Sequence, residues 1–401
     1  MAALLSLNSI PSLSGGMEEL RGMSALSPAG LALIKSQSAP AARFLPAQDK
    51  ELYSDYRIRY IIKGRMDFRQ SPPTLTADTG KVFRVTGHPF WLRLAHGRTV
   101  CVEAYARQRD DTAELKIEKL LPPDTLEGLQ PSDKIRGLQR DPKLISSEGG
   151  VPRLGNIGWA MEHDADGNMA LDADGNFISV WRSGVRVDPS RLEGAYFVKK
   201  TALKPVRYGD HGMLMFTFAP GGVVAPDGSE TNALVISLDA YYNDPESMVY
   251  SPLDALRGKY QVYYSMQTAE RYSELKFNYN EFGMPNDLVL VPYPLRVDRD
   301  ERERLLANAI AKATENNKGE MYSLLYNSCA NSALSLINSA VSDDRKIEEG
   351  WLPEIIYRTQ ATFPDTMTRL LVKKGLSGEA LPDITRTNYK EYLRGLTRAA
   401  R

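Results

Sequence analysis

The segment best suited to nucleophilic chemistry is YSLLYNSCANSAL, Tyr322–Leu334, because it places a thiol where a helix is predicted to begin. Asn327 or Ser328 can cap that helix through a side-chain oxygen. Free amides and the positive end of the helix dipole would then favour the thiolate form of Cys329, which is the nucleophilic form. A buried cysteine with a purely structural role fits the same pattern, so this segment alone leaves both interpretations open.

A cysteine nucleophile also needs a base directed at its sulfur. The sequence offers four histidines, which are His88, His96, His163 and His211. Of these, His211 opens the apolar segment HGMLMFTF, where alternation places its side chain on the same strand face as Met213 and Met215. The start of a strand can hold an imidazole rigidly. The competing interpretation is an ordinary surface or core histidine.

The order of these segments resembles the Lnb N-terminal periplasmic domain family. The resemblance covers about Tyr208 to Ser342 and is carried by DHGMLMF, by the strands and charged helix that follow, and by YSLLYNSCANSAL. That family in turn resembles circularly permuted members of the NlpC-type, papain-like cysteine hydrolase superfamily, in which the histidine precedes the cysteine. The family commonly has Asn directly before the Cys, whereas this sequence has Ser328 there and Asn327 one position earlier.

The resemblance implies that Cys329 is the nucleophile and His211 the general base and later the acid. A third polar group normally orients the imidazole. In TNALVISLDAYY, the side chains of Ser237 and Asp239 share one strand face, so Asp239 is the candidate orienting residue with Ser237 behind it. The oxyanion would be met by the backbone amide of Cys329 and a second donor that the sequence does not identify.

A Cys–His pair attacks acyl carbons, and the resemblance implies two substrate classes. The first hypothesis is a hydrolase of phospholipid acyl esters, a secreted antibacterial toxin of the phospholipase type. Permuted relatives of the lecithin:retinol acyltransferase group share the chain order, and the face of Met213 and Met215 suits an acyl chain as well as a plain core. The second hypothesis is an amidase or endopeptidase acting on peptidoglycan. The third is a binding module without catalytic activity, in which Cys329 only packs.

The predicted fold class is α+β, a permuted papain-like domain with an N-terminal β-rich unit and C-terminal helices. The predicted organisation is a flexible leader (1–50), a small β-rich unit (51–121), a connection with hairpins (122–193), the catalytic domain (194–342) and a helical extension (343–401). A helix is expected to start at Asp298, where Glu301 completes a capping box. Its buried stripe is predicted to be Leu305, Leu306, Ala309, Ile310 and Ala313.

Composition excludes several classes of protein. Fifty Lys and Arg balance fifty Asp and Glu, so no global field attracts nucleic acid or an anionic membrane. Two cysteines do not make a disulfide framework, and Cys101 alternates with valines as a buried strand residue would. DADGN occurs twice between His163 and Phe177, but the spacing lacks the complete ligand set of a calcium loop and is typical of hairpin turns. No cofactor or metal ion is expected.

The sequence has no run of eighteen apolar residues, so no transmembrane segment is expected. The N-terminus lacks the basic residues of a Sec signal peptide. The chain is therefore expected to be cytoplasmic as synthesised and to reach the periplasm of a target cell by another route. The expected partners are membrane phospholipid or cell-wall peptide as substrate, with a delivery or inhibitor protein as a further candidate.

Overall fold

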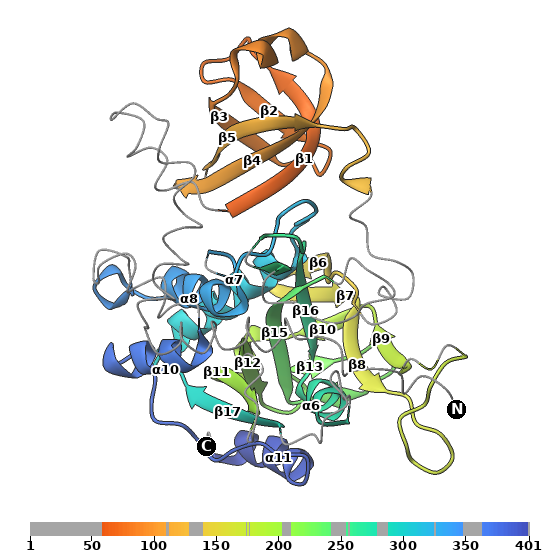
Figure 1. Ribbon diagram of the computed structural model, residues 1–401. Helices are drawn as coiled ribbons and strands as arrows, with labels where there is room; N and C mark the ends of the chain where they lie inside the picture. Colours follow the sequence, from red (N-terminus) through yellow and green to blue (C-terminus); the bar gives the residue numbers. More distant parts are fainter. Residues whose placement is uncertain are drawn as a thin grey trace, which may run out of the picture.

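A computed structural model of the chain describes residues 58–109, 112–127, 139–173, 175, 177–202, 210–241, 254–255, 257–278, 288–324, 326–347 and 363–399. The protein is a mixed α+β molecule with a small closed barrel, two further sheets and few helices, which confirms the predicted class (Figure 1). The predicted leader, residues 1–50, lies outside the described residues.

The barrel occupies Ile58–Leu121 and closes in the strand order β1-β2-β3-β5-β4. Its interior is filled by alternate side chains, among them Leu75, Phe83 and Leu115, which are almost completely buried. Its elements are β1 (Ile58–Asp67), β2 (Thr74–Ala77), β3 (Val82–Gly87), η2 (Phe90–Ala95), β4 (Thr99–Arg109) and β5 (Thr112–Leu121).

The main body contains a seven-stranded sheet in the order β17-β11-β12-β15-β16-β8-β9, in which every pair is antiparallel except β16 with β8. Its strands are β8 (Ile157–Met161), β9 (Ser179–Arg182), β11 (Leu192–Ala202), β12 (His211–Phe218), β15 (Ala233–Ala240), β16 (Val262–Thr268) and β17 (Leu288–Pro294). Two of these strands, β8 and β9, come from the segment expected as a connection.

A five-stranded sheet of short strands lies beside the larger one, in the order β14-β13-β10-β7-β6. Its strands are β6 (Lys143–Glu148), β7 (Val151–Gly155), β10 (Val185–Val187), β13 (Val223–Val224) and β14 (Glu230–Thr231), and two short 3-10 helices, η4 (Pro189–Arg191) and η5 (Asp343–Arg345), lie elsewhere in the chain. The first DADGN segment, 164–168, forms a turn between the bridged residues His163 and Met169, and a second bridge pairs Leu171 with Phe177.

Helices cover both faces of the seven-stranded sheet. On β12, Leu214 and Phe216 pack into one core, and Met213 and Met215 pack into another on the opposite face, as alternation predicts. The first core is shared with α7 (Arg299–Thr314), α8 (Cys329–Ala340) and α10 (Pro364–Lys373), and the second with α6 (Ala269–Asn278) and α11 (Tyr389–Ala399).

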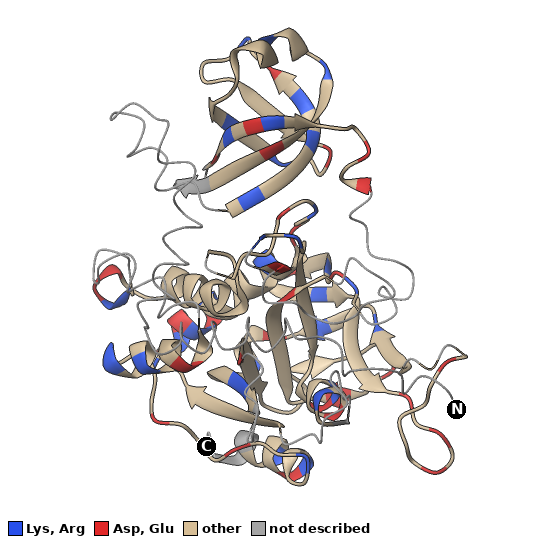
Figure 2. Ribbon diagram, viewed as in Figure 1, with Lys and Arg blue, Asp and Glu red and all other residues tan. Residues whose placement is uncertain are grey.

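The predicted capping box at α7 is confirmed, because Asp298 accepts the amide of Glu301 and the Glu301 side chain accepts the amide of Asp298. The predicted buried stripe of α7 is confirmed as well: Leu305, Leu306, Ala309, Ile310 and Ala313 are buried. Figure 2 shows Lys and Arg interspersed with Asp and Glu over the main body, in keeping with the zero net charge.

The barrel is joined to the main body by hydrogen bonds of the segment 319–322. On one side the amide of Ile61 donates to the Gly319 carbonyl at 2.8 Å, and the amide of Met321 donates to the Arg59 carbonyl at 2.9 Å. On the other side the amide of Val262 donates to the Glu320 carbonyl at 2.9 Å. The segment therefore lies between β1 of the barrel and β16 of the main sheet, seven residues before Cys329.

Gly319 is required for this close approach. Its φ is +85°, and a β-carbon at this position would lie 2.1 Å from the carbonyl oxygen of Ile61. A side chain here would therefore push the barrel away from the main body.

Candidate active site

His211 and Asp239 meet because they face each other across two neighbouring strands. Strands β12 and β15 are paired in register from Leu214–Ile236 to Thr217–Ala233. Continuing that register by three residues places His211 opposite Asp239, on the same face of the sheet. Directly opposite residues of an antiparallel pair have side chains within reach of each other.

The Nε2 atom of His211 contacts both polar residues of β15. It lies 2.6 Å from Ser237 Oγ and 3.1 Å from Asp239 Oδ1. Nε2 of His211 therefore contacts β15. The other ring nitrogen, Nδ1, is left to interact with a thiol. The structure thus brings the side chains of Asp239 and Ser237 within hydrogen-bond reach of His211.

Cys329 is the first residue of α8. Ser328 is the N-cap, and it exchanges capping hydrogen bonds with Asn331, whose carboxamide replaces the more usual Glu or Gln. The apolar side chains of Ala333, Leu334, Ile337, Ala340 and Val341 are buried against the sheet. This packing fixes the amino end of α8 beside the start of β12 (Figure 1).

The thiol of Cys329 contacts the start of β12. The backbone amide of Gly212 donates to Sγ at 3.4 Å, although the two residues are 117 positions apart. The side chains of Cys329 and His211 lie close enough for each group to shift the pKa of the other. The structure therefore brings together the cysteine and the imidazole that the sequence resemblance pairs.

The electrostatics of this pair favour the charged forms of both groups. Burial would raise the pKa of the Cys329 thiol, but the charge and hydrogen bond of His211 outweigh that effect and lower the pKa. Burial would lower the pKa of His211, but the charges of Cys329 and Asp239 raise it to about 9. The two shifts therefore favour a thiolate beside an imidazolium over the neutral pair.

Asp239 remains ionised in this setting. Burial would raise the pKa of its carboxyl, but the charge and hydrogen bond of His211, with smaller contributions from Lys276 and Ser265, lower it to about 2. The side chain of Asp239 is 28% exposed and that of His211 17% exposed, so solvent reaches this side of the site. The carboxylate stabilises the imidazolium and holds the ring.

A small hollow adjoins the thiol of Cys329, between α8 and strands β12, β15 and β16. It has a volume of about 10 Å³, which is room for roughly one water molecule. Its polar lining includes Tyr264 and Ser332, whose hydroxyls are 2.9 Å apart. Burial raises the pKa of Tyr264 to about 12, so its hydroxyl stays protonated and can donate a hydrogen bond.

Asn327 does not lie beside the thiol. Its Nδ2 donates to Glu320 Oε1 at 2.9 Å and to the Met321 carbonyl at 3.2 Å, away from Cys329. The other oxygen of Glu320 accepts from Tyr60 of the barrel at 2.7 Å and pairs with Lys312 at 3.3 Å. Asn327 therefore fixes the loop before the nucleophile, and the N-cap is Ser328 alone.

Sequence reasoning missed Glu320, Ser265, Tyr264 and Gly212. The sequence offered one indication that Glu320 is buried: it is a single acidic residue between Gly319 and the apolar Met321. The part played by the Gly212 amide could not be read from sequence, because every residue except proline offers an amide.

The remaining histidines and the second cysteine lie elsewhere. His163 pairs with Glu274 at 2.7 Å on the surface, and His88 and His96 belong to the barrel, where both lie near Phe68. Cys101 is buried in a separate apolar cluster, as expected, and both cysteines are free thiols. Among the described residues, no group of three or more His, Cys, Asp or Glu is arranged to hold a metal ion.

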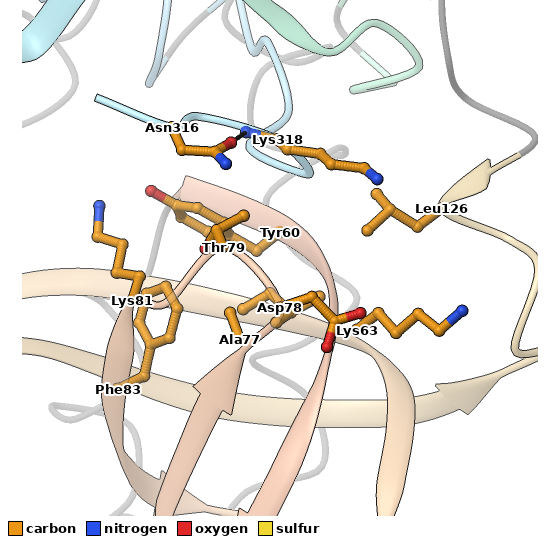
Figure 3. Close-up of a pocket in the computed structure, with 11 residues that line it drawn as sticks. Tyr60, Lys63, Ala77, Asp78, Thr79, Lys81, Phe83, Leu126, Asn316 and Lys318 are labelled. Carbon is orange, nitrogen blue, oxygen red and sulfur yellow. Dashed lines mark hydrogen bonds between the residues drawn. The ribbon is translucent and has the colours of Figure 1, made fainter. Parts of the chain in front are cut away.

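Another cavity, about 180 Å³, lies away from the thiol. It is formed between barrel strands and the segment that carries Asn316 and Lys318, with Tyr60 lying between them (Figure 3). None of its lining residues contacts Cys329 or His211 in the described part of the chain. It belongs to the junction of barrel and main body.

Comparison with known proteins gives one match. No curated protein and no solved structure matches the chain significantly. None of the helices in the described ranges is long and apolar enough to cross a membrane. A family model does match residues 182–362, and it is described as the Lnb N-terminal periplasmic domain.

This match corrects the expected location. The chain was expected to be cytoplasmic as synthesised, and the family's description as a periplasmic domain contradicts that expectation. A periplasmic or secreted location fits the match. The segment that contains Cys329, His211 and Asp239 is thus similar to the Lnb N-terminal periplasmic domain, as its motifs predict.

Proposed function

We propose that the main body is a permuted papain-like domain of the NlpC type and that the protein is a cysteine-dependent acyl hydrolase of the bacterial envelope. The observation that carries this proposal is the position of Cys329 at the amino end of α8, where its sulfur accepts the amide of Gly212 next to His211, and His211 is paired with Asp239. A thiol with a lowered pKa, a base close to it and a carboxylate behind that base are the three parts that nucleophilic thiol catalysis needs.

In the proposed mechanism the Cys329 thiolate attacks the acyl carbon, and the carbonyl electron pair moves onto oxygen. The His211 imidazolium then gives its proton to the leaving alkoxide as the carbon–oxygen bond breaks, which leaves a thioester. Neutral His211 next takes a proton from water, and the resulting hydroxide attacks the thioester. The acid is released and the sulfur regains its starting state.

The oxyanion of the tetrahedral intermediate requires preorganised donors. The amide of Cys329 lies in the first turn of α8, where backbone amides have no partner within the helix. The protonated hydroxyl of Tyr264 in the neighbouring hollow is the second donor that we propose. The hollow has room for an atom of the size of an oxyanion.

The first proposed substrate class is the acyl ester of a membrane phospholipid. The chain order of histidine before cysteine, shared with lipid acyltransferase relatives, supports this choice. The Met213 and Met215 face does not, because both side chains are packed against residues of α6 and α11 and form a plain core. The acyl chain would therefore have to approach from the exposed side of His211 and Asp239.

The packing of Met213 and Met215 in the core supports the second candidate function, which is hydrolysis of cell-wall peptides. The hollow that adjoins Cys329 has room for about one water molecule and cannot hold an acyl chain. An extended, polar substrate such as a peptidoglycan peptide needs no apolar groove. An amidase or endopeptidase of the same mechanism is therefore the alternative.

The test incubates the purified full chain separately with defined phospholipids and with muropeptides, and measures fatty-acid release and new amino groups. Cys329→Ala is the matched control, since it keeps the fold and removes the nucleophile. Product that depends on Cys329 in one arm identifies the substrate class. If neither arm gives such a product, the hydrolase proposal is wrong. Expression in the periplasm of a bacterial host tests toxicity, which must also depend on Cys329.

A further inference from the structure

One end of the barrel has an exposed apolar surface whose side chains do not contribute to the barrel core. Helix η2 is anchored by Leu92, which is completely buried among the barrel's core residues. Its neighbours point outward: Phe90 is 81% exposed, Leu94 82% and Trp91 44%. We call these three residues the barrel tip. Large apolar side chains gathered in solvent usually mark a surface that contacts a partner.

The tip is held rigidly. The amide of Gly97 donates to the Met66 carbonyl at 2.9 Å, and the amide of Met66 donates to the Arg98 carbonyl at 3.3 Å. These bonds tie η2 to the end of β1 that is remote from the main body, because the start of β1 carries the bonds to Gly319 and Met321. The tip is therefore at the free end of the barrel.

The segment that carries the tip is rich in basic residues. From Lys81 to Val102, both included, the chain has four Lys and Arg and no Asp or Glu. The side chains of Arg93 and Arg98 are exposed, and Arg65 of β1 is exposed and approaches Gly97. The acid at this end, Asp67, is paired with Arg69 at 2.9 Å. A protein with no net charge thus carries a local cationic surface around its apolar tip.

We propose that the barrel tip docks on an anionic lipid surface. Trp and Phe are suited to the interface between water and acyl chains, and nearby Arg attracts anionic headgroups. Two largely exposed side chains, Phe90 and Leu94, favour lipid over single-stranded nucleic acid, which is bound through stacking aromatics along a basic groove. The proposal does not depend on the chemistry at Cys329.

Docking would tether the main body to a membrane while the tip alone enters the headgroup region. The three apolar side chains supply the attraction that is independent of salt, and the arginines supply an attraction that salt screens. Binding should therefore need both parts. It should be stronger on anionic than on zwitterionic vesicles and weaken as the salt concentration rises.

The experiment uses the full chain with Cys329→Ala, so that no lipid can be consumed. Co-sedimentation is measured with vesicles of phosphatidylcholine alone and of phosphatidylcholine mixed with phosphatidylglycerol. The variant Trp91→Ser with Leu94→Ser should bind the mixed vesicles at least roughly tenfold more weakly. Leu144→Ser removes an exposed leucine on β6 and is the matched control, which should bind like the parent.

A second pair of variants separates the two parts of the attraction. Arg93→Gln with Arg98→Gln should remove most of the preference for phosphatidylglycerol. The Trp fluorescence of the parent should shift to shorter wavelength on binding, and Trp91→Phe should lose that shift while it still binds. Thermal unfolding must be unchanged in all variants, because these side chains are exposed.

Several outcomes would overturn the proposal. One is equal vesicle binding by the parent and the double serine variant, and another is no binding to either vesicle. Tight binding of a single-stranded oligonucleotide that the same variants abolish would assign the tip to nucleic acid. A dimer that the serine variant dissociates would assign the tip to contact between copies of this chain. Lipid hydrolysis is not measured here, so failure of the docking proposal leaves the proposed chemistry to be judged separately.

Discussion

His211 Nε2 lies 3.1 Å from Asp239 Oδ1, and this pair continues the register of β12 with β15 beyond its last paired residues. Antiparallel pairing thus brings imidazole and carboxylate together before any loop is considered. The thiol comes from the other face of the strand and reaches the pair around Gly212. The site is assembled at the place where β12 begins.

Alkylation should distinguish Cys329 from Cys101 in the native protein. The pKa of Cys329 is lowered by His211, whereas burial raises the pKa of Cys101. Iodoacetamide at about pH 7 should therefore label Cys329 well before Cys101. Peptide mass mapping measures this, and His211→Gln is expected to slow labelling of Cys329. A native protein in which neither thiol reacts would support a purely structural cysteine.

Asp239→Asn should reduce hydrolysis strongly while the fold is retained. The carboxamide has the same shape but carries no charge, so it neither stabilises the imidazolium nor fixes the required tautomer. A fall in kcat of roughly 10²- to 10⁴-fold is expected. Ser237→Ala removes a neighbouring contact of Nε2 and should cost less. An Asn variant with full activity would show that Asp239 does not orient His211.

The pH dependence should show a titration of His211 near 9. Its pKa is raised from the ordinary 6.5 to about 9, so the folded state holds the proton more tightly than the unfolded state. The stability that His211 contributes is therefore fully present below pH 6.5 and is lost as pH rises through about 9. NMR of the ring protons should give this pKa in the parent and a lower one in Cys329→Ala, where the thiolate charge is missing.

The pH dependence of hydrolysis should reflect the protonation of Cys329 and His211. Hydrolysis is expected between the lowered pKa of Cys329 and the raised pKa of His211, with a fall on both sides. The limb at high pH reports loss of the imidazolium proton that the leaving group needs. A measured profile whose alkaline limb is unchanged in Asp239→Asn would argue against the assignment of that limb to His211.

Tyr60 and Glu320 should contribute to stability across the junction of barrel and main body. Tyr60→Phe removes a buried hydrogen bond of 2.7 Å and should cost about 1–2 kcal/mol in the free energy of unfolding. Glu320→Gln leaves Lys312 without its buried carboxylate and should cost about 3 kcal/mol. Denaturant unfolding of the full chain measures both. Tyr293→Phe, at a half-buried tyrosine of β17, is the matched control.

The same two variants should also affect the thiol. Glu320 holds Asn327, and Asn327 lies two residues before Cys329. Loosening of this loop should slow alkylation of Cys329 in Glu320→Gln, with a smaller effect in Tyr60→Phe. If stability falls and the rate of alkylation does not change, the barrel stabilises the molecule without influencing the nucleophile.

Local features were determined by the sequence alone. The capping box at Asp298, the start of α8 at Cys329 and the alternation of β12 follow from neighbouring residues, because helix caps and strand faces depend on short-range hydrogen bonds and on burial. The pairing of His211 with Cys329 came from motif order and resemblance, since nothing local to either residue indicates the other.

Tertiary structure alone decided the rest. Three features depend on contacts between segments far apart in the chain. They are the orientation of Asn327 towards Glu320 and away from the thiol, the strand that lies opposite Asp239, and the place of β8 in the main sheet. Burial of Glu320 next to Tyr60 requires the barrel to be in place. Such contacts arise only when the whole core packs, because each depends on the position of a backbone that other segments hold.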